Sequence, residues 1–156
     1  SMILTKLAGI VCLGAAGGML GALKAERKRK VAVYLREYRG FLRYFLILAL
    51  EGNETPDEIL QKAKKQDRFK HMGLQNIYSL RAYTLPKWLP NQANQLQEAF
   101  HLMGTLQKNE LHQAMKEYDS LAAEFEQIAA KQSCKAKELY TKLGLAGGLL
   151  MAILLL

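Results

Sequence analysis

The sequence predicts an all-α protein: an antiparallel helical bundle flanked by an N-terminal and a C-terminal transmembrane helix. Hydrophobic residues make up 50% of the 156 residues and are most concentrated at the two ends of the chain. In the middle, apolar and charged residues recur at the three- and four-residue spacing of amphipathic helices, and no stretch alternates as a strand does. We therefore expect transmembrane helices at residues 3–23 and 142–156, and a cytosolic helical bundle domain at residues 24–141.

The N-terminal apolar segment runs from Ile3 to Leu23 and is interrupted only by Thr5 and Lys6. At about 1.5 Å per residue it reaches about 31 Å, which matches the hydrocarbon thickness of a bilayer. The basic run Lys24–Lys30 follows, and such flanks stay on the cytoplasmic side, so we expect the N-terminus outside. A cleaved signal peptide is the alternative, but its positive charge precedes the apolar region, whereas here it follows.

The C-terminal segment Leu143–Leu156 is apolar throughout, yet at about 1.5 Å per residue it covers only about 21 Å. A helix that continues back through Leu139 and Tyr140, with Lys142 snorkelling, supplies about one further turn, and local thinning of the bilayer absorbs the rest. Both segments predict the same orientation, with the central domain cytosolic and both tails outside. The basic residues on the domain side of the second segment are Lys131, Lys135, Lys137 and Lys142.

Both apolar segments carry small residues four apart, a spacing that lets transmembrane helices approach closely. The alternative is that glycine is simply frequent in membrane helices. Helix pairing within one chain and homo-oligomerisation are equally compatible with this spacing. The candidate packing residues are Gly14 with Gly18, Gly17 with Gly21, and Gly144 with Gly148.

The first helix of the central domain is expected over residues 31–50, with an apolar side formed by Val31, Tyr34, Leu35, Tyr38, Phe41, Leu42, Phe45, Leu48 and Ala49. Its other side presents Arg36, Arg39 and Arg43, which we name the basic stripe. Charged stripes on amphipathic helices usually face water, and the alternative is a surface for a partner protein. The basic stripe is therefore the candidate partner surface of the domain.

The segment Thr55-Pro56-Asp57-Glu58 has the residues of a capping box with proline in the first turn, and it predicts a second helix to about Gln66. Leu74–Tyr83 is expected to form a third helix, with Leu74, Ile77, Tyr78 and Leu80 as its apolar residues. Two prolines close together then require a turn at Thr84–Pro90. Trp88 in this turn is interpreted as closing the end of the bundle rather than stacking on a ligand.

A fourth helix is expected over Asn91–Met103, followed by a short loop at Gly104–Asn109 that suits antiparallel neighbours. The last helix then continues directly into the C-terminal apolar segment. Its expected inner residues are Leu111, Met115, Tyr118, Leu121, Ala122, Phe125, Ile128 and Ala129.

The sequence lacks the residue patterns on which catalysis, metals and nucleotides depend. The three histidines have no ligand at metal spacing, no glycine-rich loop ends in Gly-Lys-Ser/Thr, and Cys12 and Cys134 fit a reducing compartment. The net charge of +8 is explained by the basic flanks of the apolar segments, so nucleic-acid binding is not expected. We predict a scaffold or adaptor protein, not an enzyme, with no catalytic residues, metal or cofactor.

Several segments together resemble the stage III sporulation protein AB family over nearly the full chain. The most specific is the C-terminal block Tyr140–Gly148, which is followed by the apolar run Leu149–Leu156. The helix start Thr55–Glu58, the loop entry Leu102–Gly104 with Gln113 after it, and the anchored N-terminus add to the resemblance.

This resemblance implies a platform protein, similar to the inner-membrane platform of type II secretion and type IV pilus machines, with a cytosolic helical domain of that kind. It implies a role in the channel between mother cell and forespore that endospore formation requires, with the protein in the outer forespore membrane on the mother-cell side. The implied partners are the sporulation ATPase of the same operon, other membrane components of the channel and the lipid bilayer. The alternative is a small two-span, holin-like pore former, because two apolar segments on a short chain also suit that class.

Overall fold

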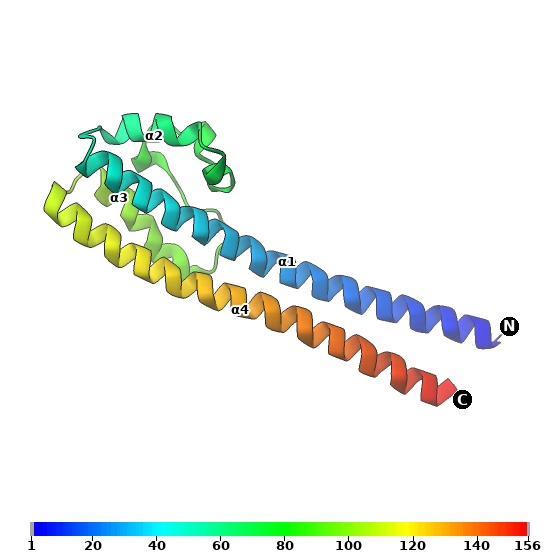
Figure 1. Cartoon of the computed structure of the whole chain (residues 1–156). Helices are drawn as coiled ribbons and strands as arrows, with labels where there is room; N and C mark the ends of the chain where they lie inside the picture. Colours follow the sequence, from blue (N-terminus) through cyan, green and yellow to red (C-terminus); the bar gives the residue numbers. More distant parts are fainter. Residues whose placement is uncertain (1, 156) are drawn as a thin grey trace. The chain divides into compact units, whose positions relative to one another are not determined.

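The computed structural model describes residues 2–155, apart from the side-chain surroundings of residues 17, 18 and 21. None of residues 2–155 lies in a strand, which confirms the all-α prediction. The elements, in chain order, are α1 (Met2–Leu50), α2 (Pro56–Lys64), the 3-10 helices η1 (Asp67–Met72), η2 (Leu74–Asn76), η3 (Leu80–Ala82) and η4 (Asn91–Gln97), α3 (Glu98–Met103) and α4 (Lys108–Leu155) (Figure 1).

The chain forms two compact units, and each long helix contributes to both. Residues 31–127 form the first, which we call the core unit. Residues 1–30 and 128–156 form the second, which we call the terminal unit. In the terminal unit the two helices lie side by side, and the Ser133 hydroxyl of α4 donates a hydrogen bond to the Ala25 carbonyl of α1 at 3.1 Å (Figure 1).

The core unit is built on the apolar face of α1. The fully buried residues of this face, each at most 1% exposed, are Tyr34, Leu35, Tyr38, Phe41, Leu42 and Phe45. Their three- and four-residue spacing places them on one side of the helix, as the sequence predicts for residues 31–50. The helix ends after Leu50, and Asn53 takes a left-handed conformation with φ of 51°, which turns the chain back toward α2.

Aromatic rings hold the short elements against this face. The Phe100 ring of α3 lies 5.6 Å from Tyr38 and 4.3 Å from Tyr83, measured between ring centroids. Phe69 of η1 packs edge-on against Phe41 at 5.6 Å. Aromatic pairs at these distances stabilise by about 0.5–1.5 kcal/mol beyond the burial of their area, so they fix the position of α3 and η1 on α1.

The capping box predicted at Thr55 is confirmed. The Thr55 hydroxyl accepts from the Glu58 backbone N–H, and the Glu58 carboxylate accepts from the Thr55 backbone N–H, both at 3.4 Å. Helix α2 then buries Ile59, Leu60 and Ala63 and ends at Lys64. The predicted inner side of this helix is therefore also confirmed.

The third helix predicted over Leu74–Tyr83 is wrong. The segment contains only η2 and η3, and Tyr78, one of the apolar residues of the predicted helix, is 89% exposed. At the end of this segment the physical reason is that one side chain from elsewhere bonds to the backbone. The Gln97 amide donates to the Tyr83 carbonyl and accepts from the Leu85 N–H, which keeps the chain extended there.

The fourth predicted helix is partly wrong, because Asn91–Gln97 is the 3-10 helix η4 and only Glu98–Met103 is α-helical. Ala93, Leu96 and Ala99 are all buried, and their spacing of three residues matches the 3-10 turn. Trp88 was expected to close the end of the bundle. Its ring packs edge-on against Tyr34 at 5.7 Å but remains 40% exposed, so it covers Tyr34 without being buried itself.

The predicted loop after Met103 is present, and α4 starts at Lys108. Its predicted inner residues Leu111, Met115 and Ala122 are buried. Ile128 is 51% exposed, so its assignment to the inner side is wrong, whereas neighbouring Ala129 is buried as predicted. The helix turns about 100° per residue, which is enough to place one of the two inside and the other outside.

Two buried tyrosine hydroxyls are linked by hydrogen bonds in the core unit. The Tyr83 hydroxyl donates to the Met72 carbonyl at 2.6 Å, and because this uses its only proton, it accepts from the Tyr34 hydroxyl at 2.6 Å. Burial raises the pKa of Tyr83 to about 12 and the pKa of Tyr34 well above its ordinary value. Both hydroxyls therefore stay protonated at neutral pH and can act as donors.

Replacing Tyr83 by Phe should destabilise the full chain by about 1–3 kcal/mol, because it leaves the buried Tyr34 hydroxyl and Met72 carbonyl without partners. Tyr34→Phe is the matched control. It keeps the bond from Tyr83 to Met72 and should cost less, about 0.5–1.5 kcal/mol. Thermal unfolding in detergent micelles, followed by circular dichroism, measures both, and a larger loss for Tyr34→Phe would contradict this hydrogen-bond order.

Candidate functional site

The basic stripe lies opposite two carboxylates of α4 within the core unit. Arg39 is central: its Nε donates to Asp119 Oδ1 and its Nη1 to Glu126 Oε2, both at 3.0 Å. Arg36 Nε lies 3.3 Å from Glu126 Oε1, and Arg43 Nη2 lies 3.5 Å from Asp119 Oδ2. Three guanidinium groups thus share two carboxylates.

The pairing follows from matched spacing on two antiparallel segments. Arg36 and Arg43 are seven residues apart on α1, and Asp119 and Glu126 are seven apart on α4, so each pair spans two turns of one helix face. No local sequence pattern marks the acidic pair. The equal spacing of these opposite charges is visible in the sequence. It predicts ion pairs only once the two helices are known to be neighbours.

The three arginines differ in how much water they contact. The Arg39 side chain is 27% exposed, and hydrogen bonds to Asp119 and Glu126 raise its pKa above the ordinary value. The side chains of Arg36 and Arg43 are 75% and 62% exposed. Arg39 ties α1 to α4. Whether the basic stripe is a solvated face or a partner surface stays a prediction.

Replacing Arg39 by Met should lower the stability of the full chain by about 1–2 kcal/mol, because two largely covered carboxylates lose their central partner. Arg36→Met makes the same substitution at an exposed position of the same stripe and should stay within about 0.5 kcal/mol of the native chain. Thermal unfolding in detergent compares the two variants. Equal losses would mean that Arg39 has no special structural role.

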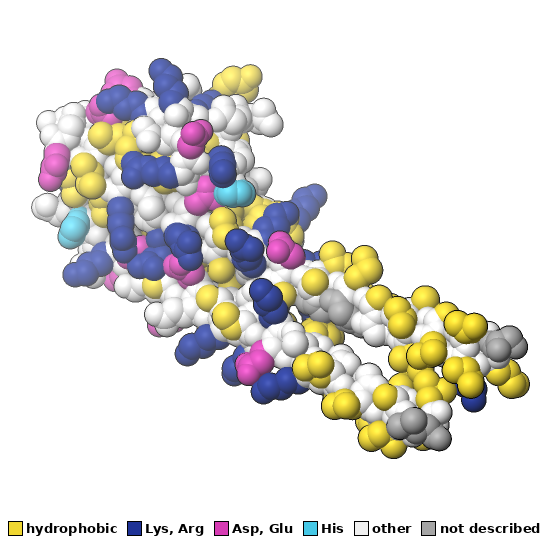
Figure 2. Space-filling model, turned by 45° about the vertical axis from the view of Figure 1, so that its right-hand side comes forward, with side chains coloured by type: hydrophobic (Ala, Val, Ile, Leu, Met, Phe, Trp, Pro, Cys, Tyr) yellow, Lys and Arg dark blue, Asp and Glu magenta, His cyan; other side chains and the backbone are white. Residues whose placement is uncertain are grey.

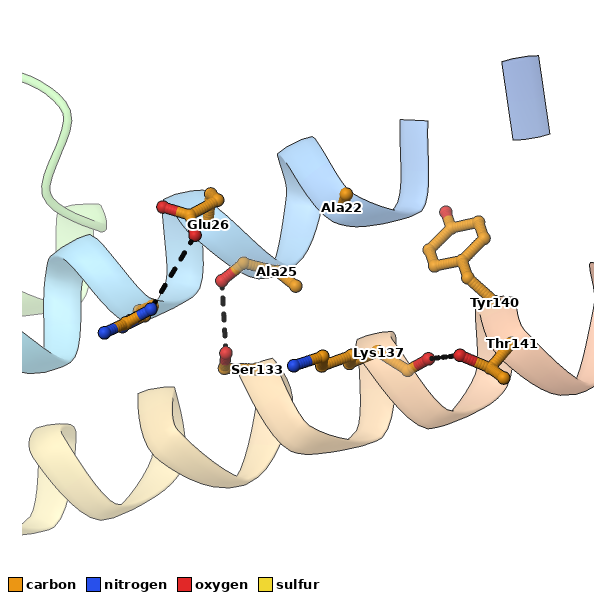
Figure 3. A pocket seen from close by; sticks show the side chains of 8 residues that line it. Ala22, Ala25, Glu26, Ser133, Lys137, Tyr140 and Thr141 are labelled. Carbon is orange, nitrogen blue, oxygen red and sulfur yellow. Dashed lines mark hydrogen bonds and ion pairs between the residues drawn. The ribbon is translucent and has the colours of Figure 1, made fainter. Parts of the chain in front are cut away.

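The terminal unit contains a polar hollow of about 430 Å³ between its two helices (Figure 3). Arg29 lies 3.9 Å from the Glu26 carboxylate, and the Thr141 hydroxyl donates to the Lys137 carbonyl at 2.7 Å. In the sequence, the basic residues here indicate only membrane topology. The hollow depends on a pairing of helices that residue spacing does not reveal. Its lining residues are Ala22, Ala25, Glu26, Arg29, Ser133, Lys137, Tyr140 and Thr141.

A second hollow, of about 370 Å³, is apolar and brings together three of the candidate packing glycines. A methyl group added at Gly14, Gly144 or Gly148 would meet no atom within 4 Å. These glycines therefore line open space, and their role in helix packing, within one chain or between copies, stays a prediction. The surroundings of Gly17, Gly18 and Gly21 lie outside what the structure describes. The other lining residues are Ile10, Leu13, Tyr140, Leu143, Gly147 and Met151.

The terminal unit exposes large apolar side chains along both helices toward the chain ends (Figure 2). Basic side chains gather on the parts of the two helices that lie farther from the chain ends. By length and composition, α4 is the one described helix able to cross a membrane, and Met2–Ala16 of α1 forms a shorter apolar stretch. Apolar surface of this extent marks a membrane or a protein interface. The chain is thus a helical protein with a potential membrane span in α4.

Within residues 2–155, no group of three or more His, Cys, Asp or Glu side chains is arranged to hold a metal ion. Cys12 and Cys134 are exposed free thiols. The predictions that the protein is not an enzyme and takes no cofactor remain predictions.

No protein-family model, curated protein or solved structure matches the chain. The resemblance to the stage III sporulation protein AB family therefore stands on the sequence segments quoted for it. The exposed apolar surface of the terminal unit and the basic stripe of the core unit are observations that do not depend on this resemblance.

Proposed function

We propose that this protein is a membrane-anchored platform of the stage III sporulation protein AB kind, which docks a cytosolic ATPase on its core unit. The observation that carries the proposal is the exposed apolar surface of the terminal unit, bordered by basic residues on both helices. A bilayer is the environment that covers such a surface, and anionic headgroups suit its basic border.

Two spans account for the distribution of charge. In the N-terminal part the apolar run 3–23 precedes Lys24–Lys30, and in the C-terminal part the apolar run 143–156 follows the lysines at 131, 135, 137 and 142. Both basic borders lie on the core-unit side in the sequence, so the positive-inside rule places residues 31–127 in the cytosol. The two antiparallel helices of the terminal unit then carry both chain ends to the opposite side of the membrane.

The docking surface is assigned to Arg36 and Arg43. Each gives one contact to a carboxylate of α4 and keeps most of its side chain in water. A guanidinium has five N–H donors, so further donors remain for carboxylates of a partner. The resemblance identifies that partner as the sporulation ATPase of the same operon, within a channel complex in the outer forespore membrane.

Reversing both exposed charges, as Arg36→Glu with Arg43→Glu, should weaken ATPase binding by about tenfold, because attraction to acidic partner groups becomes repulsion. Lys70→Glu with Lys87→Glu changes the net charge equally at exposed positions outside the stripe and should leave binding unchanged. Arg39 is kept native because its loss would disturb the fold. Pull-down of the ATPase with full-length chain in detergent measures both variants, and circular dichroism checks helicity.

Equal binding by all three proteins would remove the basic stripe as the docking surface. Equal weakening in both double variants would show a response to net charge alone. Failure of the native chain to bind the ATPase, in membranes as well as in detergent, would contradict the platform proposal.

Protease added outside sealed cells should leave the core unit intact, and Cys134 should react with an impermeant thiol reagent only after the membrane is opened. Both expectations follow from the basic borders on the cytosolic side. The purified protein in vesicles should keep an entrapped dye inside. Digestion of the core unit in sealed cells would overturn the proposed topology, and dye leakage would favour the two-span pore former.

A further inference from the structure

The two hollows of the terminal unit adjoin at Tyr140, which lines both of them. On one side of this residue most of the lining residues are charged or hydroxylated, with Ala22 and Ala25 among them, and on the other side they are glycine and aliphatic residues. Figure 3 shows the Tyr140 side chain projecting from α4 toward α1. Tyrosine is enriched at membrane–water interfaces, where its ring is in apolar surroundings and its hydroxyl is wet. The combined space has the polarity of an amphiphile.

The polar hollow presents donors for a phosphate group. Among the described residues, the Lys137 ammonium has no acidic partner and the Tyr140 hydroxyl has no hydrogen-bond partner. Arg29 has one contact, to Glu26 at 3.9 Å, which leaves other guanidinium donors available. Arginine and lysine are the side chains that proteins use for phosphate, the first through its fork of donors and the second as a point charge.

The charge around the polar hollow favours an anionic ligand. Glu26 and Glu138 are the acidic residues of the terminal unit, against a clear majority of lysine and arginine. Glu26 is paired with Arg29, and Glu138 with Lys142 at 3.2 Å. The unpaired charge is therefore positive, and a ligand with a net negative headgroup complements it.

The apolar hollow, of about 370 Å³, has room for a flexible apolar chain. An acyl chain is no wider than an aliphatic side chain, and the open space over Gly144 and Gly148 leaves room for it.

We propose that the terminal unit binds one anionic phospholipid, with its phosphate at Arg29, Lys137 and Tyr140 and an acyl chain along Gly144 and Gly148. The proposal rests on the proposed function, because it places these helices in a bilayer. It goes further by assigning a lipid class and a built site to them.

The test uses the full-length chain in nanodiscs that contain equal amounts of phosphatidylglycerol and phosphatidylcholine. After transfer to mild detergent, native mass spectrometry counts the lipids that each protein retains. The native chain should retain one phosphatidylglycerol in preference to phosphatidylcholine. Lys137→Gln should reduce that retention by about fivefold, as expected for the loss of one basic contact to an anionic headgroup. Lys135→Gln removes the same charge from the same helix outside the hollow and should have no effect.

A second pair of variants tests the acyl-chain site. Gly144→Leu fills the apolar hollow and should abolish retention of the lipid, while Ala146→Leu adds a larger side chain at a position that does not line it and should retain the lipid. A Cβ added at Gly144 meets no atom within 4 Å, and circular dichroism verifies the helicity of the leucine variant.

Equal loss of retained phosphatidylglycerol with Lys135→Gln and Lys137→Gln would overturn the site, because it would indicate diffuse attraction between basic residues and anionic lipid. Unchanged retention with Gly144→Leu would overturn it as well. A native dimer without bound lipid, dissociated by Gly144→Leu, would assign the hollow to a helix of a second copy. ATPase binding and protease protection are measured on the core unit, so loss of the lipid site alone leaves the platform proposal standing.

Discussion

The apolar face of α1 within the core unit is the surface on which the short elements depend. Helix α3 has six residues, and η2 and η3 have three each, lengths at which an isolated helix does not persist in water. Helix α3 becomes stable by burying Phe100 against Tyr38 of that face, and η2 and η3 pack against α2. Loss of large buried side chains from this part of α1 would therefore release several elements together.

The side of α1 that carries the basic stripe is bound to α4 by ion pairs in the core unit. Arg39 lies between two carboxylates of α4, and its bonds bridge residues 80 and 87 positions apart in the chain. Contacts between such distant positions fix how α1 is aligned with α4, which local helix propensity cannot specify. The flanking arginines share the same carboxylates but stay in water, so one stripe combines a structural residue with two that are free to meet other molecules.

Sequence reasoning predicted the elements whose signals are local and missed those that depend on distant contacts. The helix around Tyr34 to Phe45 and the capping box at Thr55 have periodic or short-range signatures, and both are present. The chain near Tyr83 is extended because Gln97, fourteen residues away, satisfies its carbonyl, and no local pattern contains that information. The basic stripe was identified as a surface, but its acidic partners required knowledge of which helices are neighbours. The two hollows likewise arise from helix pairing and not from spacing.

Trp88, the single tryptophan of the chain, gives the core unit its own optical reporter. Its indole packs edge-on against the buried Tyr34 ring and is 40% exposed, so its emission wavelength and its quenching by added iodide respond to movement of the Thr84–Pro90 segment. The terminal unit contains no tryptophan and contributes nothing to this signal. Intrinsic fluorescence can therefore follow opening of the core unit in intact membranes without any attached dye.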